Sequence, residues 1–205
     1  MKKIAITGTH GVGKTTLAHQ VCVTLKERNC NATIVEEKAR ACPFPINEAA
    51  STDTEIWMIH TQIKAELQAK AQKFEAAVID RCSLDAIVYW QDRNTPNCYF
   101  EKLRDAAIQW VESQYDILVL VEPSSDTDEF AIDAVRDSSI IYRNRIRDLF
   151  RDYINGLPEQ YLDRIVRVEA NEIFDGHGGY SSATKKIMNH AGFPANDCSH
   201  HLANV

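Results

Sequence analysis

The sequence lacks any hydrophobic run long enough to cross a membrane. A transmembrane helix needs about 20 consecutive apolar residues, whereas the apolar stretch that starts at Ile4 already ends at Thr7 and Gly8. The same stretch is too short for the apolar core of a signal peptide, and it predicts a buried strand instead. We therefore expect a cytoplasmic protein that has no membrane partner.

The sequence also lacks paired cysteines and an excess of positive charge. None of its six cysteines stands in a Cys-x-x-Cys pair, which argues against a zinc site or a disulfide framework. The formal net charge is −6, whereas proteins that coat nucleic acids are usually basic. DNA is therefore a disfavoured partner, although a local basic patch would be compatible with it.

Neither an internal repeat nor a low-complexity linker divides the chain. Its 205 residues are 44% hydrophobic, and a domain of this size buries roughly 70% of the surface of its unfolded chain. We expect one domain that spans residues 1–205. Residues 192–205 follow no clear pattern, and we interpret them as a frayed tail rather than a metal site, although they include His200 and His201.

Five short runs rich in β-branched residues alternate with helical patterns. Each run is nearly continuous in apolar residues, as strands are when they are buried on both faces. The alternation predicts an α/β fold, in which helices cover both faces of a parallel sheet. The expected strands span residues 3–7, 32–36, 76–80, 117–121 and 165–168.

Helices are expected where apolar residues recur every three or four positions. Thr52 and Glu55 have the spacing of a capping box, which predicts that a helix starts just before residue 54. The expected helices span residues 14–28, 54–74, 99–114, 138–154 and 181–190.

A glycine-rich segment stands between the first expected strand and the first expected helix. Residues 8–15 match the pattern G-x-x-x-x-G-K-[ST] without a gap. The glycines let successive backbone N–H groups point into one hollow, and the helix adds partial positive charge. We predict that Lys14 binds the β- and γ-phosphates of ATP and that Thr15 ligates Mg²⁺. The expected nucleotide-binding residues are Gly8, His10, Gly11, Val12, Gly13, Lys14, Thr15 and Thr16.

Acidic residues stand at the ends of two expected strands. Asp80 ends the third strand in a Walker B arrangement and is predicted to hold Mg²⁺ or its water, provided that the first and third strands are neighbours. Glu36 and Glu37 follow the second strand and must point in opposite directions, so at most one can act as a general base in the site. We favour Glu37, because it lies past the end of the strand.

The helix expected at residues 138–154 is rich in arginine. Arg136, Arg143 and Arg147 lie seven and then four residues apart, so they share one face if the helix is continuous. If the helix starts only near residue 138, Arg136 lies at the hinge instead. Such a face suits a mobile lid that closes on phosphates, and we assign this role to Arg136 and Arg143. The alternative is a solvated face, on which Asp148 and Asp152 pair with the arginines.

Several of these segments together resemble the P-loop nucleoside and nucleotide kinases. They are residues 8–15, Glu36-Glu37 with Arg40, Asp80-Arg81 and Asp133-x-x-Arg136, in this order. The resemblance is greatest to the kinase domain of the nicotinamide-riboside kinase/adenylyltransferase proteins and extends to about residue 168. The sequence departs from that group at Ala134, where glycine is common.

The resemblance implies a three-layer P-loop NTPase fold with a five-stranded parallel sheet in the order 2-3-1-4-5 and a helical lid at about residues 124–150. It implies a kinase that uses ATP and Mg²⁺ and phosphorylates a nucleoside, a nucleotide or a similar small hydroxyl compound. It also implies that the base of ATP lies near residues 178–180 and that Arg81 contacts the acceptor or the phosphates. The implied catalytic residues are Lys14, Glu37, Asp80, Arg81, Arg136 and Arg143.

The acceptor site and two other functions stay open. Asp85 and Tyr89 lie one helical turn apart and could face the acceptor, whereas Trp90 is expected in the core. One alternative is a kinase for a modified base or end in DNA, with the arginine helix as a basic track. The other is a regulatory P-loop ATPase that transfers phosphate only to water. Neither the acceptor nor the oligomeric state follows from the sequence.

Overall fold

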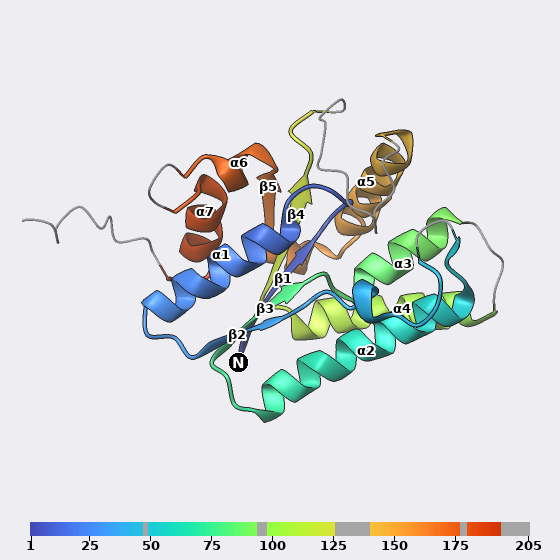
Figure 1. Cartoon of the computed structure of the whole chain (residues 1–205), viewed down its shortest axis with the longest axis horizontal. Helices are drawn as coiled ribbons and strands as arrows, with labels where there is room; N and C mark the ends of the chain where they lie inside the picture. Colours follow the sequence, from blue (N-terminus) through green and yellow to red (C-terminus); the bar gives the residue numbers. More distant parts are fainter. Residues whose placement is uncertain (47–48, 94–97, 126–139, 177–179, 194–205) are drawn as a thin grey trace, which may run out of the picture.

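The computed structural model describes residues 1–46, 49–93, 98–125, 140–176 and 180–193. Its strands form one parallel five-stranded sheet in the order β2-β3-β1-β4-β5, which confirms the predicted fold (Figure 1). Each strand lies within one residue of its predicted position at either end. The strands are β1 (Lys2–Thr7), β2 (Ala32–Val35), β3 (Ala76–Asp80), β4 (Ile117–Glu122) and β5 (Ile165–Glu169).

Helices cover both faces of the sheet, as the apolar strands require (Figure 1). On one face lie α1 (Lys14–Glu27), α6 (Asn171–Phe174) and α7 (Ser182–His190). On the other face lie α2 (Thr52–Ala71), α3 (Ser83–Asp92), α4 (Cys98–Gln114) and α5 (Ile140–Asn155). Two short 3₁₀ helices, η1 (Ala39–Ala41) and η3 (Glu159–Arg164), lie in connections.

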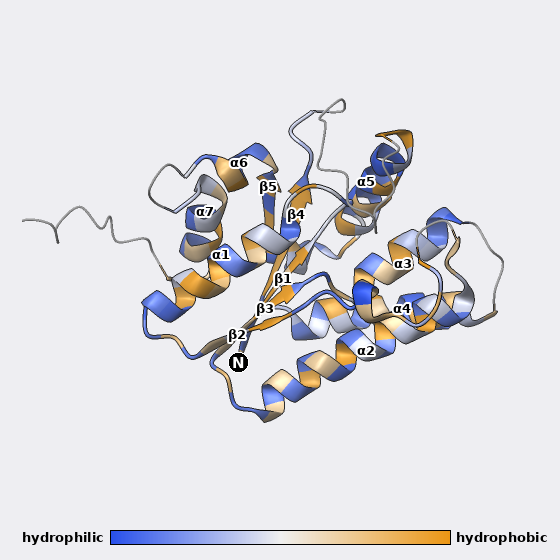
Figure 2. Ribbon diagram, in the orientation of Figure 1, coloured by the Kyte–Doolittle hydropathy of each residue, from blue (hydrophilic) through white to orange (hydrophobic). Residues whose placement is uncertain are grey.

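Successive side chains of each strand point to opposite faces of the sheet, so the sheet has a hydrophobic core on each face. Ile4 and Ile6 pack towards α1, whereas Ala5 between them packs towards α3 and α5. Figure 2 shows the central strands as mostly hydrophobic, whereas hydrophobic and polar residues alternate along the helices. Trp90 of α3 is 1% exposed, which confirms that it is a core residue.

The sheet register brings the ends of three strands together. β1 pairs with β3 through Ile6 opposite Asp80, and it pairs with β4 through Thr7 opposite Leu120. The first and third strands are therefore neighbours, which is the condition on which the prediction for Asp80 depended. Whatever follows Thr7 in the chain lies beside the carboxyl ends of β3 and β4.

Helix α2 starts two residues before the predicted position, and its predicted N-cap was wrong by one residue. Ser51, not Thr52, is the N-cap, because its backbone is extended while Thr52 is already helical. The Ser51 hydroxyl accepts a hydrogen bond from the Thr54 backbone N–H, and the Ser51 N–H donates to Thr54 Oγ1 at 2.9 Å. Glu55 takes no part in this cap and forms an ion pair with Arg93.

Two further properties concern the environment of the protein. Within the described ranges, no helix combines the length and the apolar character that a membrane crossing requires. The cysteines in those ranges are free thiols: Cys22, Cys30, Cys42, Cys82 and Cys98.

A buried ion pair joins β1 to the helices at the amino end of the sheet. Lys3 Nζ lies 3.0 Å from Glu66 Oε2, and the two side chains are 3% and 0% exposed. The indole N–H of Trp110 and the hydroxyl of Tyr115 also donate to Glu66, at 2.9 and 2.8 Å. Because these donors come from β1, α4 and the link between α4 and β4, Glu66 of α2 joins four parts of the fold.

Glu66→Ala should lower the free energy of unfolding by roughly 3–5 kcal/mol, because it leaves Lys3 buried without its counter-ion. Urea denaturation measures the change. Glu101→Ala removes a carboxylate that is 62% exposed from its pair with Arg104 and is the matched control, with an expected loss below about 1 kcal/mol. Equal losses in the two variants would contradict the assigned role of Glu66.

Candidate active site

The segment between β1 and α1 has a backbone that only glycine adopts easily. Gly8, Gly11 and Gly13 have φ angles of 136°, 77° and 85°. A Cβ atom on Gly8 would lie 2.2 Å from the carbonyl oxygen of Val121 at the end of β4. The close approach of two strand ends therefore requires glycine at position 8.

The start of α1 is open to a ligand. Gly13 is its N-cap, and no side chain among the described residues caps the helix. The first turn carries no acidic residue, so its backbone N–H groups and the helix dipole attract an anion. Thr15 and Thr16 of this turn are exposed. A helix start of this kind suits a phosphate group, and the binding of phosphate here stays a prediction.

Lys14 is held in the loop that it follows. Its ammonium group donates a hydrogen bond to the carbonyl oxygen of Thr9, and the side chain is only 5% exposed. Burial, and then repulsion from Arg81, lowers the pKa of Lys14 from 10.5 to about 7, although three nearby carboxylates partly offset this shift. The free protein thus holds Lys14 in a place where its charged form is disfavoured.

Asp80 has the position and environment of a metal ligand. It ends β3, is 2% exposed, and its Oδ1 atom receives no hydrogen bond from any described residue. Burial raises the pKa of Asp80, while a hydrogen bond from the Thr15 side chain acts in the opposite direction. A buried carboxylate beside a threonine hydroxyl fits Mg²⁺, which takes one or two protein ligands and completes its shell with phosphates and water.

No three His, Cys, Asp or Glu side chains in the described ranges come together as a metal-binding cluster. Asp80 and Thr15 alone would therefore hold a metal ion weakly. The pair fits a cation that arrives with a nucleotide better than a permanently bound one.

A cavity opens beside the phosphate loop, between η1, α2 and α3. His10 of the loop lines it together with Glu37, Arg81, Asp85 and Tyr89. The Tyr89 hydroxyl lies 3.3 Å from His10 Nδ1. Apolar wall comes from Ala39, Ile46, Ala50, Met58 and Ala86.

Arg81 is the centre of the polar groups in this cavity. Its guanidinium forms one ion pair with Glu37 and another, at 3.2 Å, with Asp85. Asp85 is fixed in turn, because Oδ2 accepts hydrogen bonds from the Thr7 hydroxyl at 2.7 Å and from the Cys82 N–H at 2.9 Å. Arg81 also has a φ angle of 70°, which is strained for a residue with a side chain and is typical of functional sites.

The structure distinguishes the two glutamates that follow β2. Glu37 lines the cavity and pairs with Arg81, whereas Glu36 is exposed. Asp85 and Tyr89 both line the same cavity as Glu37. The catalytic roles assigned to these residues stay predictions.

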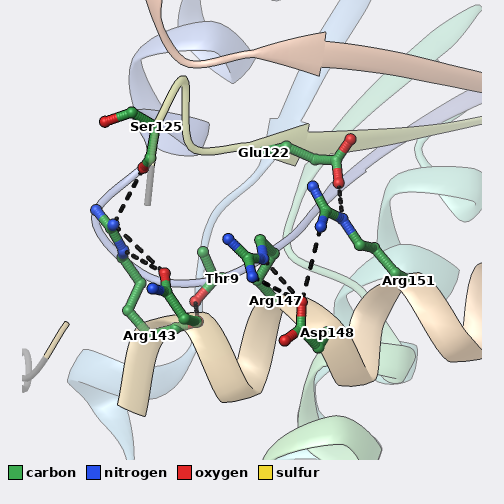
Figure 3. Close-up of polar contacts among 8 residues, drawn as sticks. Thr9, Glu122, Ser125, Arg143, Arg147, Asp148 and Arg151 are labelled. Atoms are coloured by element: carbon green, nitrogen blue, oxygen red, sulfur yellow. Dashed lines mark hydrogen bonds and ion pairs between the residues drawn. The ribbon is translucent and has the colours of Figure 1, made fainter. Parts of the chain in front are cut away.

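The arginines of α5 have different surroundings (Figure 3). Arg143 is 1% exposed and lies against the phosphate loop, where its carbonyl oxygen accepts a 2.9 Å hydrogen bond from the Thr9 hydroxyl. Its guanidinium is directed to the carbonyl oxygen of Ser125 at 3.3 Å. The predicted lid residue Arg136, by contrast, lies outside the described residues.

The other arginines of α5 form ion pairs. Arg145 pairs with Asp92, and Arg147 with its neighbour Asp148. Arg151 pairs with Glu122 at the end of β4 (Figure 3). These contacts match the alternative of a helix face with acidic partners, whereas Arg143 remains the lid candidate that touches the phosphate loop.

A second groove lies on the other side of α1, with a volume of about 680 Å³. Thr16 lines it from the phosphate loop side, and Phe174 and Tyr180 line it from the segment after β5. Phe174 is 62% exposed, and its ring lies 3.1 Å from the point that a Cβ on Gly13 would occupy. Residues 178 and 179, near which the base of ATP is predicted, lie outside the described residues.

Comparisons with known proteins agree with this geometry. The sequence model of one family, described as an AAA domain, matches residues 3–170. No curated protein matches the sequence. Solved structures resemble the chain at low identity, which shows the fold alone.

Three of these structures illustrate the likeness. NadR protein in complex with NR has a TM-score of 0.69 and 21% identity over 97% of this chain, which spans about half of NadR (54%). Deoxyadenosine kinase from M. mycoides, with products dCMP and dCDP bound, has a TM-score of 0.60 and 17% identity, and the match covers 93% of this chain and 98% of the kinase. Thymidylate kinase from Ehrlichia chaffeensis has a TM-score of 0.62 and 16% identity, and the match covers 92% of this chain and 97% of that kinase. The predicted resemblance is confirmed at the level of the fold.

Lys14→Met should stabilise the free protein at neutral pH. Folding lowers the pKa of Lys14 from 10.5 to about 7, so the cost of the buried charge is greatest below pH 7 and fades as the pH rises towards 10.5. We expect the variant to be more stable by roughly 4 kcal/mol at pH 7 and by less than about 1 kcal/mol at pH 10. Urea denaturation in a buffer free of phosphate and sulfate measures the difference.

Lys26→Met is the matched control, because Lys26 is an exposed lysine of the same helix. Its stability should change by less than about 0.5 kcal/mol at either pH. A gain for Lys14→Met that stays constant between pH 6 and pH 10 would show that the pKa of Lys14 is not lowered.

Proposed function

This chain belongs to the AAA-domain family, and we propose that it is an ATP- and Mg²⁺-dependent kinase. In the proposed reaction, the γ-phosphoryl group of ATP moves to a hydroxyl group of a nucleoside, a nucleotide or a similar small molecule. One observation carries the proposal: the uncapped start of α1 and a cavity that contains the carboxylate of Glu37 lie on either side of one loop, and His10 of that loop lines the cavity.

The phosphate loop supplies positive charge on the ATP side. Backbone N–H groups at the start of α1 would bind phosphate oxygens. A bound triphosphate would also favour the charged form of Lys14, which burial disfavours in the free protein. Thr15 and Asp80 would hold Mg²⁺, which neutralises charge on the phosphate oxygens when it is bound.

On the cavity side, the carboxylate of Glu37 would bind the hydroxyl group of the acceptor. That carboxylate would accept the hydrogen bond of the acceptor hydroxyl and then its proton, as a general base does. The acceptor oxygen forms a bond to the γ-phosphorus while the bond from that phosphorus to the β-phosphate oxygen breaks, and ADP leaves. Arg81, held between Glu37 and Asp85, would keep the carboxylate in position. Positioning and electrostatics supply most of the catalysis in this chemistry.

The groove beside α1 would receive the base of ATP. Its exposed Phe174 touches the phosphate loop at Gly13, and an exposed aromatic ring can stack on a base. Arg143 would serve as a lid residue, because it lies at the edge of the same loop, and Arg136 would serve with it. The free thiols are in keeping with a cytoplasmic enzyme.

Incubation of the protein with Mg·ATP and a panel of nucleosides and nucleotides tests the proposal. We expect one class of acceptor to be phosphorylated. We expect Lys14→Met to lower that activity by at least about 10³-fold, because the variant lacks the positive charge that would stabilise the γ-phosphoryl group during transfer. Chromatography of the acceptor products measures the transfer, and Lys26→Met is the control with normal activity.

The same assay separates the alternatives. Release of free phosphate at a rate that no acceptor changes would contradict the kinase and favour a regulatory ATPase. Phosphorylation of DNA ends, without phosphorylation of any small acceptor, would contradict the proposed substrate class.

Glu37→Gln should lower kcat by roughly 10²–10⁴-fold, because the amide cannot accept the proton of the acceptor. The KM for ATP should change little, since Glu37 lies on the cavity side of the loop. Steady-state kinetics at saturating acceptor measure both constants. Glu36→Gln alters the exposed neighbour and should retain kcat within a factor of about two. Equal kcat values for the two variants would show that Glu37 is not the base.

A further inference from the structure

Two residues of α3 and its C-cap form one stripe along the cavity beside the phosphate loop. Asp85, Tyr89 and Arg93 are four residues apart, so they lie on the same side of the helix, and all three line the cavity. At 1.5 Å per residue, Asp85 and Arg93 are separated by about 12 Å along the helix axis. The cavity thus has two ends, one at the start of α3 and one just after it.

The two ends differ in their neighbours. At the start of α3, Asp85 and Arg81 join Glu37 beside the phosphate loop, where the proposed transfer takes place. At the far end, Arg93 forms an ion pair with Glu55 of α2. Apolar side chains and the ring of Tyr89 lie along the wall between them. This distribution suits a molecule with a hydroxyl group at one end and a polar ring at the other.

The ion pair at the far end is costly for a purely structural contact. Glu55 is 4% exposed, and burial raises its pKa to about 7 even though Arg93 acts in the opposite direction. Apolar residues often hold two helices together as well as a buried ion pair does. Glu55 and Arg93 instead present charged groups to a cavity, which is typical of a binding site.

We propose that Glu55 and Arg93 recognise the polar edge of the acceptor's ring and so determine its class. Glu55 accepts a hydrogen bond from an N–H group of that edge, and Arg93 donates one to the adjacent carbonyl oxygen or ring nitrogen. The acceptor is then a riboside or similar compound whose ring carries a carboxamide or an amino group next to an acceptor atom. This inference depends on the proposed kinase function.

The pair also predicts which analogues the cavity rejects. A carboxylate in place of the carboxamide would face the like charge of Glu55, and such repulsion is a common source of specificity. A ring without the N–H group would not donate to Glu55, which would then keep only its contact with Arg93. We expect each change to lower kcat/KM by roughly 10- to 100-fold.

Matched ribosides test this expectation. One pair is nicotinamide riboside and nicotinic acid riboside, and the other is adenosine and purine riboside, which lacks the amino group. Assays at pH 8.5 keep Glu55 ionised, since its pKa is about 7, and saturating Mg·ATP isolates the acceptor step. The wild-type protein should prefer the first member of any pair that it phosphorylates, by about 10-fold or more.

Glu55→Gln is the decisive variant, because its amide has the same shape but can donate as well as accept a hydrogen bond. The preference within a pair should fall below about 3-fold, with the second member gaining activity. A contact that merely joined α2 to α3 would not produce that gain. Arg93→Met should instead lower kcat/KM for both members of a pair. Glu101→Gln, in the exposed pair with Arg104, should change neither the preference nor the activity.

The outcomes separate this inference from the function on which it depends. If no riboside or other small acceptor is phosphorylated, the proposed function fails, and the inference fails with it. If ribosides are phosphorylated but the wild-type protein shows no preference, only the inference is overturned. The same holds if folded Glu55→Gln, checked by its melting temperature and by ATP binding, keeps the full preference.

Discussion

The pairing of β1 with both of its neighbours determines where every candidate functional group lies. Because Ile6 is opposite Asp80 and Thr7 is opposite Leu120, three strands end at one edge of the sheet. The phosphate loop leaves β1 at that edge, and the carbonyl oxygen of Val121 limits its first residue to glycine. A slip of β3 by one residue would move Asp80 away from the loop and reverse the faces of its neighbours. The hydrogen bonds of the central strand are thus the basis of the proposed chemistry.

Buried charges at the two ends of the sheet serve different purposes. At the amino end, Glu66 receives donors from Lys3, Trp110 and Tyr115, so a charged group in the core has its hydrogen bonds satisfied. At the carboxyl end, burial lowers the pKa of Lys14 to about 7 and raises that of Asp80. Shifts of this kind oppose folding unless a ligand compensates them. The satisfied charge of Glu66 thus serves the fold, whereas the shifted pKa values of Lys14 and Asp80 are typical of groups that bind a ligand.

The sequence predicted the fold and the phosphate side of the site better than the acceptor side. A glycine pattern between a strand and a helix determines a local backbone, and apolar strands determine a parallel sheet. The choice of Ser51 rather than Thr52 as N-cap was missed, because both residue types are good caps. The partners of the arginine helix were partly missed, since Arg145 pairs with Asp92, which lies 53 positions away. Phe174 belongs to no sequence motif, so only its position beside Gly13 of the phosphate loop makes it a candidate site residue.

The contact between Thr9 and Arg143 joins a rigid loop to a separate helix. The Thr9 hydroxyl donates to the backbone of α5, not to a side chain, so the contact does not depend on which residue occupies position 143. A hydroxyl changes its acceptor by rotation about a single bond, and one such hydrogen bond contributes only about 1 kcal/mol. Loss of this one hydrogen bond would therefore cost α5 little, because Ile146, Phe150 and Ile154 of the same helix are 0% exposed and anchor it in the core. The core therefore holds α5 in place, and the hydrogen bond from Thr9 determines how the start of that helix meets the loop.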